Sequence, residues 1–246
     1  MQKLKGIIQY DGTAFAGYQI QPNGRTIQAE IEAVLQKMHK GQTVKVTASG
    51  RTDAGVHAVG QVIHFTSDLN IPPEGWNRAL NAMLPDDIRI ADIQYADAGF
   101  HARYDTKGKE YRYKVLNQKD PDLFRRYYNY HVPQKLDVAA IKEACRYLEG
   151  EHDFTSFCSA RSTVKGGKVR TITKADIHPE GNELVFIFRG TGFLYNMVRI
   201  LVGTLLEIGK GERKPEEIMA MIEAKDRSAA GKTAPPHGLF LWEVFY

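Results

Sequence analysis

Ten consecutive residues, Ser49–Ala58 (SGRTDAGVHA), bring together a cation, a carboxylate and an imidazole: Arg51, Asp53 and His57. An aspartate near an arginine stays ionised well below neutral pH, and an ionised carboxylate can act as a nucleophile or as a general base. Asp and Gly are also common turn residues, so the segment is either a plain turn or a loop that presents a reactive carboxylate. His57 has no assigned role in either interpretation.

Two distant residues are further candidates. Tyr111 and Tyr113 alternate with Arg112 and Lys114, so one face of a strand carries two rings, which either pack in the core or stack on a base. Arg199 lies off the apolar stripe of a helical segment and is either a surface residue or a cation aimed into a cleft.

A basic segment, Arg161–Lys174 (RSTVKGGKVRTITK), carries five Lys or Arg residues and no acid. The whole chain has a mild net charge of +4 and a sequence pI of about 8.9. The segment is therefore either a solvated surface or a loop that contacts the phosphates of a polyanion. The candidate RNA-contact residues are Arg161, Lys165, Lys168 and Arg170.

The first half of the chain must position the Asp53 segment. Apolar spacing and turn residues predict the order β-α-β-β-α-β, which is the ferredoxin-like pattern. The expected elements are a strand at Lys3–Tyr10, a helix at Thr26–Met38, strands at Thr43–Ala48 and Val59–Thr66, a helix at Pro73–Leu84 and a strand at Ile88–Tyr95.

The second half repeats this order with one extra helix. The expected elements are a strand at Lys109–Leu116, a helix at Asp137–Leu148, a hairpin of strands Val169–Ile177 and Glu183–Arg189, a helix over 194–206, a helix at Pro215–Ala224 and a strand at Leu239–Tyr246. The prediction is an α+β fold of two related halves, residues 1–100 and 101–246, joined into a mixed, mostly antiparallel sheet with a central cleft.

Composition excludes several classes of protein. No run of 18 or more apolar residues is present, so the sequence predicts no membrane span. The two cysteines, Cys145 and Cys158, stand in no metal or redox spacing, which favours reduced thiols in a cytosolic protein. The histidines form no metal-binding motif, so no metal site is predicted.

Five segments, read together, closely resemble the tRNA pseudouridine synthase A family. They occur in the family's order and spread over almost the whole chain. They are Ser49–Ala58, Lys109–Tyr113 (KEYRY), Gly190–Arg199, Val202–Gly211 (VGTLLEIGKG) and Ala234–Leu239 (APPHGL).

The resemblance implies a cytoplasmic isomerase that converts uridine to pseudouridine at positions 38, 39 and 40 in the anticodon stem-loop of tRNA. It implies a homodimer that uses no metal or organic cofactor. Asp53 matches the family's essential aspartate, and Tyr111 matches the tyrosine that stacks on the target uracil. Arg51 matches an arginine implicated in base flipping, and Arg199 matches one that pairs with the catalytic carboxylate.

Two questions stay open at this stage. The element order alone also fits a non-catalytic RNA-binding protein, although neither half carries the aromatic pattern of an RNA-recognition motif. The sequence does not choose whether Asp53 attacks the sugar, attacks the base or removes a proton from the sugar.

Overall fold

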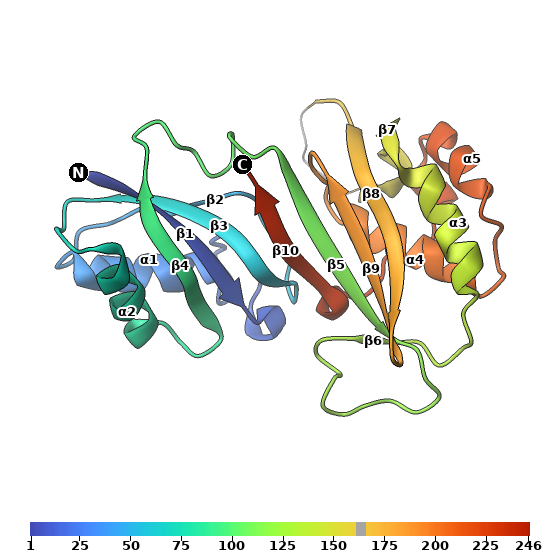
Figure 1. The fold of residues 1–246 in the computed structure, drawn as a ribbon, viewed down its shortest axis with the longest axis horizontal. Coiled ribbons are helices and arrows are strands. Elements are labelled where there is room, and N and C mark those ends of the chain that lie inside the picture. The colour runs from blue at the N-terminus through green and yellow to red at the C-terminus, as the bar shows by residue number, and fades with distance from the viewer. Residues whose placement is uncertain (161–165) are drawn as a thin grey trace. The chain divides into compact units, whose positions relative to one another are not determined.

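The computed structural model describes residues 1–160 and 166–246, and these form two compact units. The first unit comprises Met1–Lys107 and Phe240–Tyr246, and the second comprises Gly108–Leu239 (Figure 1). The first unit extends beyond residue 100, where the sequence placed the boundary. It also contains almost all of the last strand, which chain order had assigned to the second half.

The first unit is built on a sheet with strand order β4-β1-β3-β10. Strand β3 is antiparallel to β1 and to the short β2, whereas β10 pairs with β3 in parallel. In β1 every second residue is buried, which leaves one face for the core and one partly exposed face. The strands are β1 (Gln2–Tyr10), β2 (Thr47–Ala48), β3 (His57–Ser67), β4 (Ile88–Ala96) and β10 (Leu239–Phe245).

Two helices accompany this sheet, α1 (Ile27–Met38) and α2 (Pro73–Met83). Helix α1 buries Ile27, Ile31 and Leu35, which recur at helical spacing. Helix α2 begins at a proline, whose missing N–H needs no partner in the first turn, and it packs along β4.

The second unit has a sheet of its own, with strand order β5-β9-β8-β7. These neighbours are antiparallel, and the short β6 pairs with β5 in parallel. The strands are β5 (Gly108–Leu116), β6 (Tyr130–His131), β7 (Gly150–Asp153), β8 (Val169–Glu180) and β9 (Glu183–Gly190).

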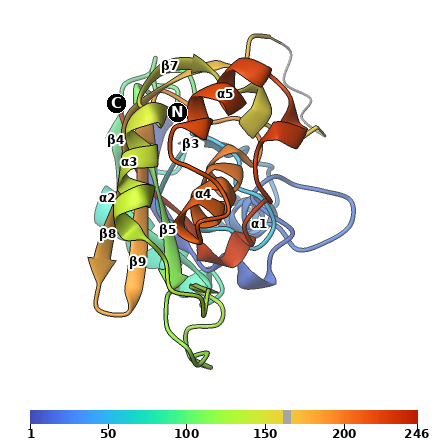
Figure 2. The same ribbon diagram turned by 90° about the vertical axis from the view of Figure 1, so that its right-hand side faces the viewer.

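Three helices belong to the second unit: α3 (Val138–Leu148), α4 (Met197–Gly209) and α5 (Glu217–Ala224). Helices α3 and α4 pack against each other (Figure 2). Nearly every residue of α4 is buried, as expected for the core helix of the unit. In the described residues no helix is long and apolar enough to cross a membrane.

The predicted α+β class is confirmed, and the predicted order of elements in the first half is found. The expected strand Thr43–Ala48 was too long, because only Thr47 and Ala48 pair with β3. The sequence missed the short strands β6 and β7, whose few, largely polar residues give no alternating pattern.

Candidate functional site

The Asp53 loop, which we define as residues 49–56, connects the antiparallel strands β2 and β3 in the first unit. Val56 N donates to Asp53 O over 3.1 Å, which closes a turn, and Gly55 supplies the left-handed backbone there with a φ of 75°. The Asp53 side chain is half-buried and Arg51 is exposed. The carboxylate and the cation therefore lie on the outer part of the same loop.

A buried polar network lies beneath this loop. Tyr10 OH and Thr52 Oγ1 share a hydrogen bond of 2.8 Å. The Gln61 side chain donates to Gly50 O over 2.9 Å and accepts from Ser49 Oγ over 2.7 Å. Burial raises the pKa of Tyr10 to about 12, so its hydroxyl stays protonated. The network fixes Ser49, Gly50 and Thr52, and so holds the two neighbours of Arg51, of which Thr52 also precedes Asp53.

The chain segment after β1 packs directly on the back of the loop. Tyr18 N donates to Thr52 O over 3.1 Å. A Cβ at Gly17 would lie 2.9 Å from Thr52 O, and a Cβ at Gly12 would lie 2.1 Å from Val56 O. Only glycine permits this close backbone approach, which leaves the loop little room to shift.

His57 follows the loop as the first residue of β3 and is buried. Its Nδ1 accepts from Gly12 N over 3.0 Å, and its ring stacks on Phe240 with centroids 4.7 Å apart. The imidazole therefore connects β3 to the segment after β1 and to β10. Sequence analysis did not predict these contacts.

Tyr111 lies on β5 in the second unit and is largely buried. Its ring meets Phe193 edge-on, with centroids 5.1 Å apart. Tyr113, on the same strand face, is fully buried, and its OH donates to Pro235 O over 2.8 Å. Tyr111 and Tyr113 were predicted to share one face of the strand, either in the core or as a stacking surface. Tyr113 packs in the core.

Arg170 lies close to the segment that carries Phe193. A Cβ at Gly192 would lie 3.6 Å from Arg170 Nε, and a Cβ at Gly190 would lie 3.4 Å from the ring of Phe193. Both distances are ordinary van der Waals contacts, so neither neighbour requires a glycine; the close approach at Gly190 is instead to the backbone of β8, because a Cβ there would lie 2.6 Å from Thr171 O.

Glu110 is a buried carboxylate directly before Tyr111. Arg189 Nη2 donates to Glu110 Oε2 over 2.7 Å, and Arg112 Nε donates to Oε1 over 2.9 Å. Burial alone would raise the pKa of Glu110, but hydrogen bonds from these two arginines hold it below its ordinary value. Both guanidinium groups are thereby held beside the strand that presents Tyr111.

Arg199 lies half-buried in the first turn of α4. Its Nε donates to Ala234 O and its Nη1 to Asn196 Oδ1, each over 2.8 Å. Asn196 has a left-handed backbone (φ 59°), so the regular helix begins at Met197 and not at Leu194 as the apolar spacing suggested. These contacts hold the guanidinium at the start of the helix.

The basic segment is described in part. Lys168 and Arg170 are half-buried, and Arg170 Nη1 donates to Gly167 O over 3.1 Å. The other two predicted RNA-contact residues, Arg161 and Lys165, lie outside the described residues.

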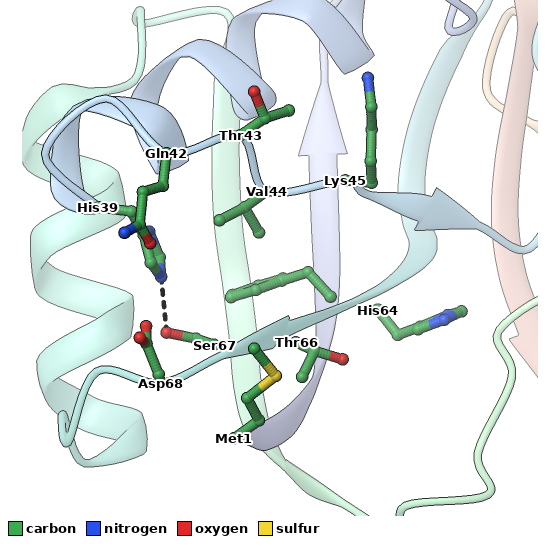
Figure 3. Close-up of a pocket in the computed structure, with 11 residues that line it drawn as sticks. Met1, His39, Gln42, Thr43, Val44, Lys45, His64, Thr66, Ser67 and Asp68 are labelled. Carbon is green, nitrogen blue, oxygen red and sulfur yellow. Dashed lines mark hydrogen bonds between the residues drawn. The ribbon is translucent and has the colours of Figure 1, made fainter.

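One hollow of about 290 Å³ opens on the first unit (Figure 3). His39, at the end of α1, lines it, donates from Nδ1 to Leu35 O and accepts from Ser67 Oγ, each over 2.7 Å. Both ring nitrogens are used, which makes His39 a structural residue. None of the described site residues lines this hollow. In residues 1–160 and 166–246 no three His, Cys, Asp or Glu side chains are grouped so that they could hold a metal ion.

A family model described as tRNA pseudouridine synthase matches residues 7–105 and 144–246, which is most of the chain. The chain belongs to this family. The tRNA pseudouridine synthase A of Oceanobacillus iheyensis is 55% identical over 246 residues, which cover 100% of this chain and 97% of that protein. The tRNA pseudouridine synthase A of Geobacillus sp. (strain WCH70) is 58% identical over 245 residues, with 100% and 98% covered.

A solved structure, a Cbf5-Nop10-Gar1 complex, is similar over 83% of this chain and 54% of its own, at 15% identity. Its TM-score of 0.34 is too low to support an argument about the fold.

Membership of the tRNA pseudouridine synthase family confirms the predicted enzyme class, an isomerase, and the predicted reaction, formation of pseudouridine in tRNA. The roles of Asp53, Arg51, Tyr111 and Arg199 stay predictions. Asp53 and Arg51 lie in the first unit, whereas Tyr111 and Arg199 lie in the second.

Sequence analysis did not identify several residues that hold the candidate site in place. Tyr10, Gln61 and Glu110 are among them. Each is a polar residue inside a strand, where alternation predicts only whether it faces the core. The one available signal was a polar side chain at a position where the pattern predicts burial, as at Tyr10 and Gln61.

Proposed function

We propose that this protein converts uridine to pseudouridine in the anticodon stem-loop of tRNA, at positions 38, 39 and 40, and that Asp53 is the catalytic carboxylate. The membership of the tRNA pseudouridine synthase family supports the reaction. The observation that carries the role of Asp53 is its place on a loop that a buried network and two glycines hold in position, with its carboxylate half-exposed.

The reaction explains why such a loop is needed. The N-glycosidic bond breaks, the uracil turns, and a carbon–carbon bond forms to the same sugar carbon. A carboxylate that attacks the sugar, attacks the base or removes a sugar proton must stand within contact distance of the reacting nucleotide, and small displacements of such a group are costly. A loop braced by buried hydrogen bonds meets this requirement.

In the proposal Tyr111 stacks on the target uracil, Arg51 helps to extrude the base, and Arg199 pairs with the carboxylate. Extruding a base costs a few kcal/mol, and stacking on an aromatic ring returns about 1–3 kcal/mol. The edge contact from Phe193 supports this role, because it fixes the Tyr111 ring. The fixed guanidinium of Arg199 suits an ion pair with a carboxylate.

The decisive experiment is the Asp53→Asn variant. It removes the negative charge and keeps the shape of the side chain, so we expect turnover to fall at least about a thousandfold while tRNA still binds. Pseudouridine is mapped by position in an unmodified tRNA transcript after treatment with each protein. Asp92→Asn, which neutralises an exposed carboxylate on β4, is the matched control and should retain full activity.

Substantial turnover by Asp53→Asn would disprove the catalytic role. The same map tests the positions, since product outside 38, 39 and 40 would contradict the anticodon assignment.

The basic segment is proposed to grip the tRNA backbone through Arg161, Lys165, Lys168 and Arg170. Neutralising Lys168 and Arg170 together should weaken tRNA binding and flatten its salt dependence, by about 0.9 in the logarithmic slope for each phosphate that the protein no longer neutralises. Binding titrations between 50 and 200 mM salt measure this slope. A slope equal to that of the unaltered protein would mean that the two cations are merely solvated.

The proposal includes a cytoplasmic homodimer without metal or organic cofactor, as the family resemblance implies. Sedimentation of the pure protein tests the dimer, full activity after treatment with a metal chelator tests the absence of a metal, and full activity of protein refolded from denaturant without added small molecules tests the absence of an organic cofactor.

A further inference from the structure

Tyr104 is a large aromatic side chain that the fold leaves 78% exposed. It lies on residues 97–107, the segment that follows β4 in the first unit and that we name the aromatic loop. The proposed chemistry assigns no role to this loop.

The Tyr104 ring is held in place although its outer side is open. It stacks on the imidazole of His101, with centroids 4.2 Å apart and an angle of 23° between the planes. His101 Nδ1 in turn accepts from the backbone N–H groups of Arg103 and Tyr104, each over 3.2 Å. One face of the tyrosine ring is therefore covered, and the ring is ordered before any partner arrives.

The aromatic loop is itself firmly attached to the partly exposed face of the sheet. Lys3 Nζ donates to Phe100 O over 2.9 Å, and Ala102 N donates to His64 Nδ1 over 3.1 Å. Tyr246 OH donates to Ala102 O over 2.6 Å. His64 is also one of the residues that line the hollow (Figure 3). Binding to a loop that is already ordered costs little conformational entropy.

The aromatic loop carries exposed cations and lies over two lysines of β1. Arg103 and Lys107 are exposed on the loop, and Lys3 and Lys5 approach it from β1. Lys5 Nζ lies 4.2 Å from the ring centroid of Tyr246 and 5.1 Å from that of Phe100. The loop's acids are Asp97 and Asp105, and Asp105 accepts from His101 N over 2.8 Å. The loop itself thus carries two cations and two carboxylates, and Lys3 and Lys5 on β1 add two further cations.

We propose that Tyr104, backed by His101 and carried on the same loop as the exposed cations Arg103 and Lys107, is a platform on which an unpaired nucleotide of the tRNA substrate stacks. A fixed ring among cations is the arrangement by which proteins bind single-stranded nucleic acid, because every base has a face to stack and every nucleotide a phosphate to pair. The exposed neighbours of Tyr104 on the loop are charged, whereas the centre of a protein–protein interface is depleted of charge. This inference rests on the proposed function, which supplies tRNA as the substrate.

The test compares Tyr104→Ala with Tyr104→Phe. Alanine removes the stacking surface, so we expect the Kd for an unmodified tRNA transcript to rise about 5- to 150-fold, whereas phenylalanine keeps the ring and changes Kd less than about twofold. The turnover rate at saturating tRNA should stay within about twofold in both variants, since the platform binds and does not react.

The charge part of the proposal has its own pair of variants. Arg103→Gln with Lys107→Gln should lower the logarithmic salt slope of binding by about 1–2, as expected when one or two phosphates are no longer neutralised. Arg89→Gln neutralises an exposed arginine on β4 and should leave the slope unchanged.

Three results would overturn the proposal: an unchanged Kd in Tyr104→Ala, an equal loss in Tyr104→Ala and Tyr104→Phe, or a weakened self-association of Tyr104→Ala in sedimentation without tRNA. The last would identify a protein interface instead. Failure of the stacking platform is distinguished from failure of the proposed function by the activity of the unaltered protein. If only the platform is wrong, the unaltered protein still forms pseudouridine in tRNA. If the proposed function is wrong, it forms none.

Discussion

At the scale of single residues, the Asp53 loop depends on polar groups that never reach the surface. Thr52 precedes Asp53, and its hydroxyl is buried against Tyr10. A buried hydroxyl that loses its partner costs about 1–3 kcal/mol, so the Tyr10 hydrogen bond selects one position of the loop over others. The residue next to Asp53 is thus held in place by a buried tyrosine on β1.

The Tyr10→Phe variant tests this dependence. It deletes only the hydroxyl and leaves Thr52 Oγ1 without this partner, so the loop can shift and we expect kcat to fall about tenfold while KM changes little. Single-turnover kinetics on unmodified tRNA measure the effect.

Tyr18→Phe is the matched control. Tyr18 is buried on the same side of the loop, its ring centroid lies 6.4 Å from that of Tyr10, and its OH has no hydrogen-bond partner in the described part of the chain. Removing this hydroxyl should leave kcat unchanged and should not lower the free energy of unfolding. If both variants lose activity equally, the loss comes from general loosening of the core and the network has no specific role.

The sequence could suggest Asp53 and Arg51 because reactive side chains were concentrated in one short segment. It could not suggest the contacts of Tyr10, Gln61 and Glu110 with Thr52, Gly50 and Arg189, since these partners lie 42, 11 and 79 residues away along the chain and only folding brings them together. The sequence also could not predict that Tyr113 is more deeply buried than Tyr111, because strand alternation places both rings on the same face.

At the scale of elements, most helices and strands followed from apolar spacing, and the differences have local causes. The extended residues before Thr47 bond to α1 side chains: Val46 N donates to Glu32 Oε1 over 3.0 Å, and Gln28 Nε2 donates to Val46 O over 3.2 Å. These side chains take the place of a neighbouring strand. Sequence patterns describe which face is apolar, not which group satisfies the backbone.

The junction between β3 and the aromatic loop should be sensitive to pH. Burial, with His101 and Lys3 nearby, lowers the pKa of His64 to about 4 despite the opposing charge of Asp105. His64 thus binds its proton more weakly when folded than when unfolded, where its pKa is about 6.5. The contribution of His64 to the free energy of unfolding is therefore fully present above about pH 6.5 and is lost as the pH drops toward 4.

We expect the protection of the Ala102 amide, measured as a hydrogen-exchange protection factor, to fall by about 1 kcal/mol between pH 7 and pH 5, after allowing for solvent screening of the half-exposed ring. His64→Asn keeps an acceptor for Ala102 N but cannot titrate, so its protection factor should be the same at both values. An equal fall in this variant would show that another group controls the junction.

At the scale of the whole molecule, chain order and spatial order differ. The last strand, β10, follows the entire second unit in sequence, yet Phe240 and Leu241 pair with His57 and Ala58 in the first unit. Lys107 N also donates to Phe245 O over 2.9 Å. A Cβ at Gly60 would lie 2.3 Å from Trp242 O, so β10 and β3 approach closely. The last strand thus completes the unit that carries Asp53. The order of elements along the chain had assigned this strand to the second half.

Leu241→Ala should therefore weaken the first unit, although the residue comes after the second in sequence. Leu241 is fully buried, and truncating such a leucine costs about 2–5 kcal/mol. Hydrogen exchange should show the loss of protection in β1 and β3, next to the Asp53 loop, and much less in β8 and β9. Leu201→Ala, at a fully buried position of α4, should produce the opposite distribution. If each variant instead lowers protection equally in all four strands, the two units unfold as one cooperative body and β10 stabilises both.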